Sequence, residues 1–471
     1  MSHRTNTLRA SLTCSSAGCL WCATAFTQGR VRRECSRGPH PKEKFDLVWA
    51  ILILSILFMV AGAPLAYVVG ASSVLGFVAT DKVRYLAVLP QRVFSQIDVF
   101  ALMAMCLFIT TGEVMNRTGV TKALVDFAMS LVGRLRGGLG YVNVLTSIFF
   151  AGISGSAVAD AAALSNTLVP AMLQKGYPRS YAAAITVAGS IIGPIIPPSI
   201  ILIFYGALMQ VSIGGLLAAG ILPGFLLGVS LLIANWYFAR RHHHPGGRHE
   251  IVPPFFPTLF RAGPALMLPV IIVGGIVVGV VTPTEAAALA VVASIAAGAF
   301  YGGVNVRVVV ISMKRTAVLS GSIFMVMAAA ACAAWIGALQ EWPQALASLV
   351  TRFELSGMWL LLMVNLLFVI AGTIMEPPMC LALLVPLLGP TCVAQGVDPI
   401  HLGIVLCLNM TLGLASPPVG GSLVVVSAIT GEDFWRLCGA VMPFLVVETL
   451  VLLVLILVPE ISLVIPRYFG Y

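Results

Sequence analysis

The feature that most constrains this 471-residue chain is a pair of proline-broken apolar segments, one in each half. The first is GPIIPPS at residues 193–199, and the second is GLASPPVG at residues 413–420. A Pro-Pro pair removes two backbone donors, and each unsatisfied polar group costs several kcal/mol in hydrocarbon. Broken helix survives at membrane depth only where it is buried or lines a cavity, so the paired breaks predict a binding site between two repeats.

Composition places the chain in a membrane. Hydrophobic residues make up 59% of it and charged residues 10%, and apolar stretches long enough to cross a bilayer recur along nearly the whole sequence. These values exclude a soluble protein. The formal net charge of +9 does not indicate a nucleic-acid partner, because Lys and Arg fall in short loops, as expected for the cytoplasmic loops of a multi-pass protein in a lipid bilayer.

Residues 1–45 differ from the rest, forming a polar, Arg-rich tail that holds four of the ten cysteines. We expect this tail to be a disordered extension or a miscalled start. Cys19 and Cys22 have the spacing of a zinc or redox pair but lack the second pair of ligands that a zinc site needs. The other six cysteines lie in apolar segments, where a thiol behaves as a small hydrophobe, so no disulfide framework is predicted.

The remainder divides into two repeats, which we place at residues 46–250 and 251–471. Their landmarks keep register, since Pro386 stands 216 positions after Pro170, Gly396 stands 220 positions after Gly176 and Pro417 stands 220 positions after Pro197. Such even offsets indicate an internal duplication. The offsets alone leave open whether the repeats are parallel or inverted in the membrane.

Each repeat contains an apolar run with small and polar residues at its middle. The run from residue 142 to 173 has 32 positions, which as one helix would span about 48 Å against a hydrocarbon core of about 30 Å. It therefore predicts a re-entrant hairpin with its tip near Ser154. Residues 371–378 offer the counterpart, again with a glycine, a hydroxyl and a carboxylate, the last from Glu376. Each half thus brings a hairpin tip toward a broken helix.

These tips and breaks offer two kinds of binding group. Unwound carbonyls and serine or threonine hydroxyls suit Na⁺, whereas half-helix N-termini favour an anion, so the pattern predicts cation-coupled uptake of an anion. For any one serine, close helix packing explains the residue equally well. Asp160 and Glu376 each cost about 3 kcal/mol at the centre of a membrane helix, which favours a role at a cavity or cation site.

Other polar features are interpreted as structural. Glu285 follows Thr282 and Thr284 as in an ordinary helix start, and Glu113 and Glu448 are assigned the same kind of role. Residues 116–138 mix apolar positions at helical spacing with Lys and Arg, which predicts a helix lying along the membrane surface. The polar loop at residues 240–248 is expected to face the cytoplasm, and we interpret its histidines as solvated.

From about Phe45 to its end, the chain resembles the large membrane subunit, of the DctM type, of tripartite ATP-independent periplasmic (TRAP) transporters. The motifs that carry the resemblance occur in family order: AGISGSAVADAAAL at 151–164, GPIIPPSI at 193–200, VTPTEAAAL at 281–289 and PPVG at 417–420. The sequence departs from the family pattern at Glu376, where an Asp-Pro tip is usual, at Ser416, where a Thr is usual, and at Gly421, where a large apolar residue is usual.

The resemblance implies an all-α polytopic membrane protein of two inverted repeats with re-entrant hairpins and broken helices, working as an elevator-type transporter. It implies uptake of an organic anion, such as a C4-dicarboxylate, another carboxylate or a sugar acid, with Na⁺ as the coupling ion and no organic cofactor. It also implies a small four-helix membrane subunit and a periplasmic substrate-binding protein as partners, in the bacterial inner membrane.

The candidate site combines residues chosen for their chemistry with residues that match the family motifs. The candidate Na⁺ ligands are Ser154, Gly155, Ser156, Pro197, Ser199, Gly372, Thr373, Glu376, Ser416 and Gly420, and the candidate residues of the substrate and ion pathway are Asp160, Asn166, Pro198, Asn409, Pro417 and Pro418. We expect at least two Na⁺ per cycle, because two charges crossing 100 mV supply about 4.6 kcal/mol.

Two alternatives stay open at this point. Residues 152–155 have the GxSG pattern of a nucleophile turn, which favours an intramembrane serine protease, although the only His beyond the loop near residue 240 is His401. The other alternative is a dicarboxylate/Na⁺ symporter that needs no binding protein. We expect a transporter and not an enzyme, because repeat symmetry has no part in the chemistry of a serine protease.

Overall fold

The computed structural model describes residues 62–80, 82–246, 252–342 and 357–471, together with five isolated residues, Leu54, Leu57, Phe58, Gln344 and Ser348. The tail of residues 1–45 lies outside the described residues. The described part consists of helices and loops, with one isolated bridge between Arg136 and Gly246. Six of its helices are long and apolar enough to cross a membrane, or seven if the bent pair α3 and α4 is one span. The predicted all-α, multi-pass fold is confirmed.

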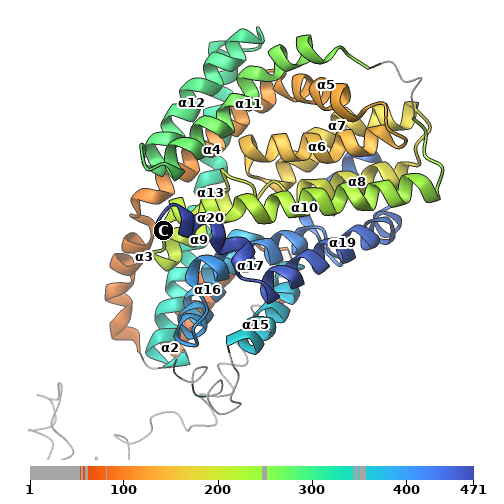
Figure 1. Ribbon diagram of the computed structural model, residues 1–471. Helices are drawn as coiled ribbons and strands as arrows, with labels where there is room; N and C mark the ends of the chain where they lie inside the picture. The colour runs from red at the N-terminus through yellow and green to blue at the C-terminus, as the bar shows by residue number, and fades with distance from the viewer. Residues whose placement is uncertain are drawn as a thin grey trace, which may run out of the picture.

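The helices follow the chain in two similar series (Figure 1). The first contains α2 (Leu65–Ala79), η1 (Val83–Val88), α3 (Leu89–Ile97), α4 (Phe100–Arg117), α5 (Val120–Val132), α6 (Gly138–Ser154), α7 (Ala157–Gln174), α8 (Arg179–Ser190), α9 (Ile200–Met209) and α10 (Ile213–Arg241). The second contains α11 (Phe255–Val277), α12 (Pro283–Phe300), α13 (Val306–Leu339), α15 (Gly357–Gly372), α16 (Pro377–Ala394), α17 (Pro399–Leu414), α18 (Gly421–Thr430), α19 (Phe434–Leu457) and α20 (Glu460–Tyr468).

The two series match with an almost constant shift. Helices α16, α17, α18 and α19 begin 220, 220, 221 and 221 positions after α7, α8, α9 and α10. In the same register α2 corresponds to α12, and the pair α3 and α4, which is bent by 56°, corresponds to the long helix α13. The helix order therefore supports the duplication seen in the sequence, while the boundary at residue 250 stays a prediction.

Equivalent helices also exchange contacts. Helix α2 packs on α13 while α12 packs on α4, and α7 packs on α18 while α16 packs on α9. Helices α10 and α19 run antiparallel: Phe238 near the end of α10 lies 5.2 Å from Phe444 in the first half of α19, measured between ring centroids. At the other end, a side chain on Gly214 at the start of α10 would meet Tyr471, beyond the end of α19. Opposite directions are the relation expected of inverted repeats.

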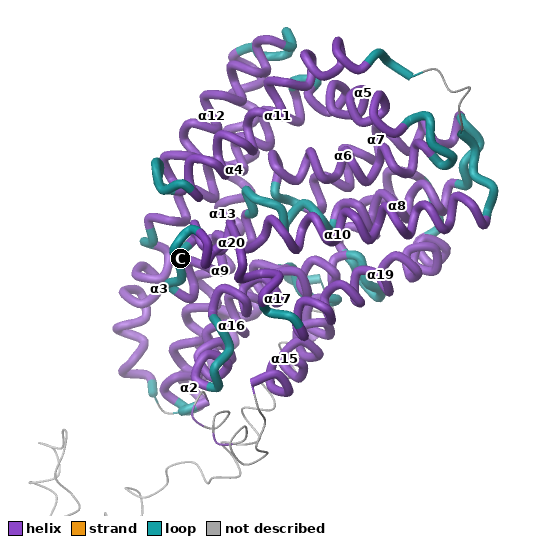
Figure 2. Tube along the Cα trace, in the orientation of Figure 1, coloured by secondary structure: helices purple, strands orange, loops and turns teal. Residues whose placement is uncertain are grey.

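Both predicted hairpins and both breaks are present. Helices α6 and α7 are joined by Gly155 and Ser156, and α15 and α16 by residues 373–376. Residues 191–199 separate α8 from α9 and residues 415–420 separate α17 from α18, so that loop segments also lie inside the helical body (Figure 2). At 1.5 Å per residue, the 10 residues of α9 and of α18 reach about 15 Å, half of the hydrocarbon core.

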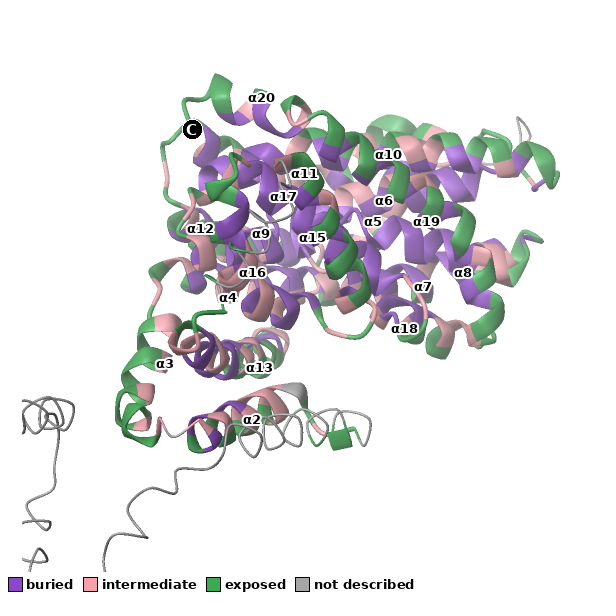
Figure 3. Cartoon of the chain, turned by 90° about the horizontal axis from the view of Figure 1, so that it is seen from below, coloured by how far each residue is buried: buried purple, intermediate pink, exposed green. Residues whose placement is uncertain are grey.

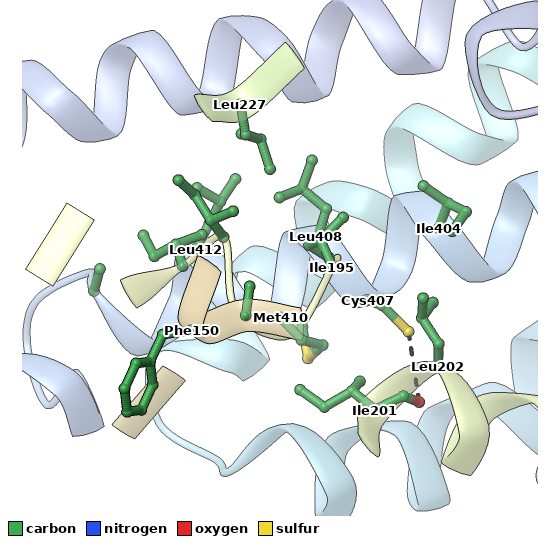
Figure 4. Close-up of a cluster of buried hydrophobic side chains, with 14 of the residues drawn as sticks. Phe150, Ile195, Ile201, Leu202, Leu227, Ile404, Cys407, Leu408, Met410 and Leu412 are labelled. Atoms are coloured by element: carbon green, nitrogen blue, oxygen red, sulfur yellow. Dashed lines mark hydrogen bonds between the residues drawn. The ribbon is translucent and has the colours of Figure 1, made fainter. Parts of the chain in front are cut away.

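Apolar packing holds the breaks in place. Ile195 of the first break lies in a cluster with Phe150 of the first hairpin, Leu227 of α10, and Leu408 and Leu412 of α17 (Figure 4). All five side chains are buried. Exposed residues gather on outer helices such as α3, which has no buried residue, while the centre is buried (Figure 3). The hairpins and breaks thus form the core of the protein.

One polar contact per repeat ties the first hairpin arm to the broken helix. In the first repeat Asn143 donates from Nδ2 to Oγ1 of Thr186 at 2.7 Å, and in the second Asn409 donates from Nδ2 to Oδ1 of Asn365 at 2.7 Å. All four side chains are buried. Because α6 corresponds to α15 and α8 to α17, each repeat has a hydrogen bond between the same pair of helices, although its two residues lie three positions further along their helices in the second repeat.

Two of the three acids interpreted as structural have the expected partners. Glu113 forms ion pairs with Arg117 at 3.3 Å and with Arg315 of α13 at 3.2 Å. Glu285 closes a capping box at the start of α12, accepting from the backbone N–H of Thr282 at 2.8 Å. These two interpretations are confirmed. Glu448 has no such partner and is treated separately below.

The surface helix and the polar loop meet at one end of the core. Helix α5 packs on α6 and α11 with Val120, Leu124 and Phe127 buried, as the spacing predicted. The interpretation of the loop histidines as solvated is wrong for His244, which is buried with its ring centroid 4.1 Å from that of Tyr181. Burial lowers the pKa of His244 to about 4, so the ring is neutral at neutral pH.

The Asn365–Asn409 contact predicts a measurable loss of stability. Asn409→Ala should destabilise the protein by about 1–2 kcal/mol, the upper range for hydrogen bonds between membrane helices. Thermal unfolding in detergent measures the change. Asn166→Ala is the matched control, because the exposed Asn166 side chain bonds only to the carbonyl of Ala162 in its own helix. Equal shifts for the two variants would contradict the prediction.

Candidate functional site at the hairpin tips and helix breaks

The tip of the first hairpin is organised by three consecutive residues. Ser154 ends α6 and donates its hydroxyl to Oδ1 of Asp160, one turn into α7. Gly155 follows with φ of 59°, a left-handed conformation that favours glycine. Ser156 is the N-cap of α7 and accepts from the backbone N–H of Ala159 at 3.5 Å. The tip therefore turns tightly while Asp160 is held inside it.

This tip lies directly against the first break. A Cβ on Gly155 would stand 2.6 Å from the carbonyl oxygen of Pro198 and 3.3 Å from the backbone nitrogen of Ile200. A Cβ on Gly193, at the start of the break, would meet Oδ2 of Asp160. That oxygen is buried and has no hydrogen-bond partner among the described residues. The structure thus brings together Ser154, Gly155, Asp160 and the first break, as predicted.

The first break is inaccessible to solvent. Pro197, Pro198 and Ser199 are all buried, and the Pro197–Pro198 peptide bond is cis. Ser199 is the N-cap of α9: its hydroxyl accepts from the backbone N–H of Leu202 at 3.2 Å and donates to the carbonyl of Pro194. Helix α9 therefore begins inside the protein with its N-terminus beside the hairpin tip.

The second tip and the second break also meet. A Cβ on Gly413 would stand 2.6 Å from the carbonyl oxygen of Gly372, so the end of α17 touches the end of α15 through two glycines. Gly420, with φ of 49°, leaves no room for a side chain, since a Cβ would stand 2.9 Å from the carbonyl oxygen of Ser416. The hydroxyls of Thr373 and Ser416 donate to carbonyls of their own helices, both at 2.8 Å.

The expectation that both hairpins carry an equivalent buried carboxylate is wrong. Glu376 is exposed and is the N-cap of α16, so it corresponds to Ser156. The position equivalent to Asp160, three residues after the first residue of the helix, holds the buried Cys380. The pairing with Glu376 followed the order of residue types in the two hairpins, whereas the 220-residue register and the helix starts both pair Asp160 with Cys380, four residues or about one helical turn further on.

The second break is also more open than the first. Pro417 is half-buried and Pro418 is exposed, whereas their equivalents Pro197 and Pro198 are buried. The Pro417–Pro418 peptide bond is cis, like that of the first break. The second repeat therefore presents its break toward a more accessible region.

The two repeats approach each other at Gly421. A Cβ on Gly421, the first residue of α18, would stand 3.8 Å from Cγ2 of Val158 in the first turn of α7 and 3.3 Å from Cδ2 of Leu414. The start of α7 thus lies close to the start of α18 as well as to that of α9. Three half-helix N-termini converge on the tip of the first hairpin, each carrying a partial positive charge.

For two candidate pathway residues the structure shows other surroundings, and their role in the pathway stays a prediction. Asn166 is exposed on α7, and Asn409 is engaged with Asn365 inside the helix packing. The sequence reasoning also missed Gly193, Asn143 and Thr186. The glycine beside the first proline was a usable signal for Gly193, whereas the two polar residues are buried partners only because the fold joins α6 to α8.

Paired hairpins facing broken helices in a multi-pass helical protein define the architecture of a secondary transporter. The chain belongs to the family described as "Tripartite ATP-independent periplasmic transporter, DctM component", whose profile matches residues 52–461.

Individual relatives agree with this family. The chain is 36% identical to the sialic acid TRAP transporter large permease protein SiaM of Vibrio cholerae, over 81% of this chain and 90% of that protein. It is 35% identical to the C4-dicarboxylate TRAP transporter large permease protein DctM of Pseudomonas aeruginosa, over 85% of this chain and 93% of that protein. The fold is similar to that of the Alcanivorax borkumensis YdaH transporter, with a TM-score of 0.59 and 16% identity over 89% of this chain and 98% of that one.

The protease alternative is therefore dropped, since the relatives are permease subunits and not enzymes. The geometry agrees with this conclusion. Ser154 donates to Asp160, while His401 forms a 2.7 Å hydrogen bond with Ser462 of α20.

The Gly155 contact gives a prediction with a matched control. Gly155→Ala should destabilise the protein by about 1–3 kcal/mol more than Gly176→Ala. Both glycines have positive φ, but a Cβ on Gly176 meets nothing within 4 Å. Both variants therefore carry the free-energy cost of placing alanine at a positive φ. Only Gly155→Ala also forces the hairpin tip away from Pro198. Thermal unfolding of both variants in detergent measures the difference, and matching midpoints would count against close packing of tip and break.

Proposed function

We propose that this chain is the large permease subunit that carries an organic anion into the cell together with Na⁺, after a periplasmic binding protein delivers the anion. The observation that supports this proposal most directly is the convergence of three half-helix N-termini on a buried acid with one unpartnered oxygen, Oδ2 of Asp160. An acid and positive helix ends in one place suit the joint binding of a cation and an anion.

The cation would bind on the Asp160 side of the first tip. Carboxylate and carbonyl oxygens are the hard donors that Na⁺ prefers, and the carbonyl of Pro198 lies beside Gly155. A bound cation would also give Oδ2 of Asp160 the partner that a buried charge requires. Na⁺ is here a transported ion and not a resident cofactor.

The anion would bind near the starts of α7 and α18, where the second break is accessible. The absence of a side chain at Gly421 enlarges this region compared with the large apolar residue usual in the family. Two similar relatives are named for sialic acid and for C4-dicarboxylates, both carboxylates. We therefore propose a carboxylate as the substrate, with the binding protein making the finer selection.

An elevator movement is supported by the surface between two groups of helices. A cavity of about 90 Å³ lies among α3, α9, α13 and α16, where Gln96, Leu208, Met327 and Pro386 join a group of alanines, Ala330, Ala331, Ala334 and Ala382. Small, smooth side chains interlock little, so they oppose sliding less than large ones. In the proposed movement, the hairpins and breaks travel against α3 and α13.

The proposal includes a location and two partners. The family description includes the words "periplasmic transporter", and the similar proteins come from bacteria. Both facts support a location in the bacterial inner membrane. Exposed apolar side chains, such as Phe256, Val292 and Val318 on α11, α12 and α13, give the surface that lipid and a small membrane subunit would cover.

Uptake into proteoliposomes tests the proposal. The vesicles should contain this chain with its small membrane partner, with the binding protein outside and a Na⁺ gradient imposed, and labelled carboxylates serve as probes. We expect uptake only when both the gradient and the binding protein are present. Uptake without the binding protein would instead support the binding-protein-independent symporter, and uptake that ignores the gradient would overturn Na⁺ coupling.

The unequal hairpins give a second, sharper comparison in the same assay. Asp160→Asn should lower Na⁺-driven uptake by at least about tenfold, because a buried amide replaces the charged ligand. Glu376→Gln should change uptake by less than about threefold, because Glu376 is exposed. A reversed order of the two effects would show that the second tip carries the essential acid.

A further inference from the structure

Glu448 is a fully buried acid that the proposed site does not use. It lies on α19 with 0% of its surface exposed. Neither carboxylate oxygen has a hydrogen-bond partner among the residues that the structure describes. Asp160, the other fully buried acid, at least accepts a hydrogen bond from Ser154. The environment of Glu448 therefore leaves two buried acceptor atoms to be accounted for.

The repeat symmetry locates this acid relative to the second break. Glu448 is the fifteenth residue of α19, as Leu227 is of α10. Leu227 points toward Ile195 of the first break and Leu408 of α17 (Figure 4). The equivalent surroundings of Glu448 are the second break and α8, and α19 does pack against α8, α17 and α18. By this equivalence we infer that the acid faces the helices that carry the second break.

This position complements the missing hairpin acid. In the first repeat the buried acid, Asp160, lies on α7, whereas the equivalent position in the second repeat is Cys380. The second repeat has its buried acid on α19 instead. Each repeat therefore has one fully buried acid among its described residues, on a different helix.

No positive side chain in the described part of the chain pairs with Glu448. The helices that pack against α19 are α8, α10, α15, α17 and α18, and α15 and α18 carry no titratable residue. The titratable groups on the others and on α19 itself are Arg179, Tyr181, Tyr237, Arg240, Arg241, His401, Cys407, Arg436 and Cys438, and among described residues none forms an ion pair or hydrogen bond with Glu448. The arginines stand at helix ends.

Leaving a carboxylate unpaired in this setting costs several kcal/mol. We propose that Glu448 binds a monovalent cation, Na⁺ or H⁺, and forms the cation site of the second repeat. This inference rests on the proposed function, in which cation binding drives transport. It assigns the second coupling charge to α19 and not to the exposed Glu376 at the hairpin tip.

Cation-dependent thermal stability tests Na⁺ binding without requiring transport. The full chain, purified with its small membrane partner, is unfolded in NaCl and in choline chloride at constant pH, and at low and high pH without Na⁺. Glu448→Gln keeps the shape of the side chain and removes its charge. Glu460→Gln is the matched control, since Glu460 is exposed and pairs with Arg467 at 2.9 Å.

If Glu448 binds Na⁺, Glu448→Gln weakens the stabilisation by NaCl, lowers the cooperativity of Na⁺ in uptake, and leaves the pH response as in the wild type. If it binds H⁺, the wild type loses stability as pH rises, and Glu448→Gln removes that loss while keeping the NaCl response. Glu460→Gln should behave as the wild type in every condition. The first outcome identifies Na⁺. The second identifies H⁺ only if Glu448→Gln also removes a pH dependence of uptake, because any buried neutral acid loses stability as pH rises; a pH effect on stability alone would overturn the proposal.

The proposal is overturned if Glu448→Gln and wild type respond identically to NaCl and to pH. Should Glu448→Gln fail to fold, Glu448→Asp keeps the charge with a shorter reach, and we expect cation affinity about tenfold weaker than in the wild type. An unchanged affinity in Glu448→Asp would also overturn it. Absence of Na⁺-driven uptake by the wild-type complex would defeat the proposed function, whereas the stability responses to NaCl decide Na⁺ binding by Glu448 separately.

Discussion

Backbone groups that cannot reach water are the constraint on which this structure depends. Two helices are interrupted by Pro-Pro pairs inside the core, and every freed carbonyl there must find a partner or a ligand. The first break meets this demand through Ser199, which both caps α9 and donates to Pro194, and through the hairpin tip that covers it. Gly155 allows that cover because a side chain would collide with Pro198.

The same solution is used twice but not equally. Glycine contacts join tip to break in both repeats, and an asparagine hydrogen bond ties each hairpin to its broken helix. The first break is sealed and holds an acid, while the second is partly exposed and has cysteine at the equivalent position. Such divergence suits a transporter, because a cation and an anion need different surroundings.

Electrostatics links this architecture to the proposed cycle. Helix N-termini attract an anion and a buried carboxylate attracts a cation. Burying either the anion or the cation alone costs desolvation free energy that no opposite charge offsets. Binding of one therefore favours binding of the other, which is the basis of coupling. The acids Asp160 and Glu448 lie on α7 and α19, one in each repeat, so in the proposed cycle a cation at each would neutralise the core before it moves.

The sequence by itself determined the membrane setting, the duplication, the hairpin near Ser154 and both breaks. These follow from local chemistry, because apolar length, proline and glycine act on the residues next to them. The tertiary structure alone decided which polar residues meet. It placed Asp160 against Gly193, exposed Asn166 on α7, paired Asn409 with Asn365, and exposed Glu376. It also buried Glu448 without a hydrogen-bond partner among the described residues, which the sequence did not indicate. Burial and partnership depend on contacts between different helices, such as those of Asp160 with Gly193 and of Asn365 with Asn409, and no spacing along one segment records them.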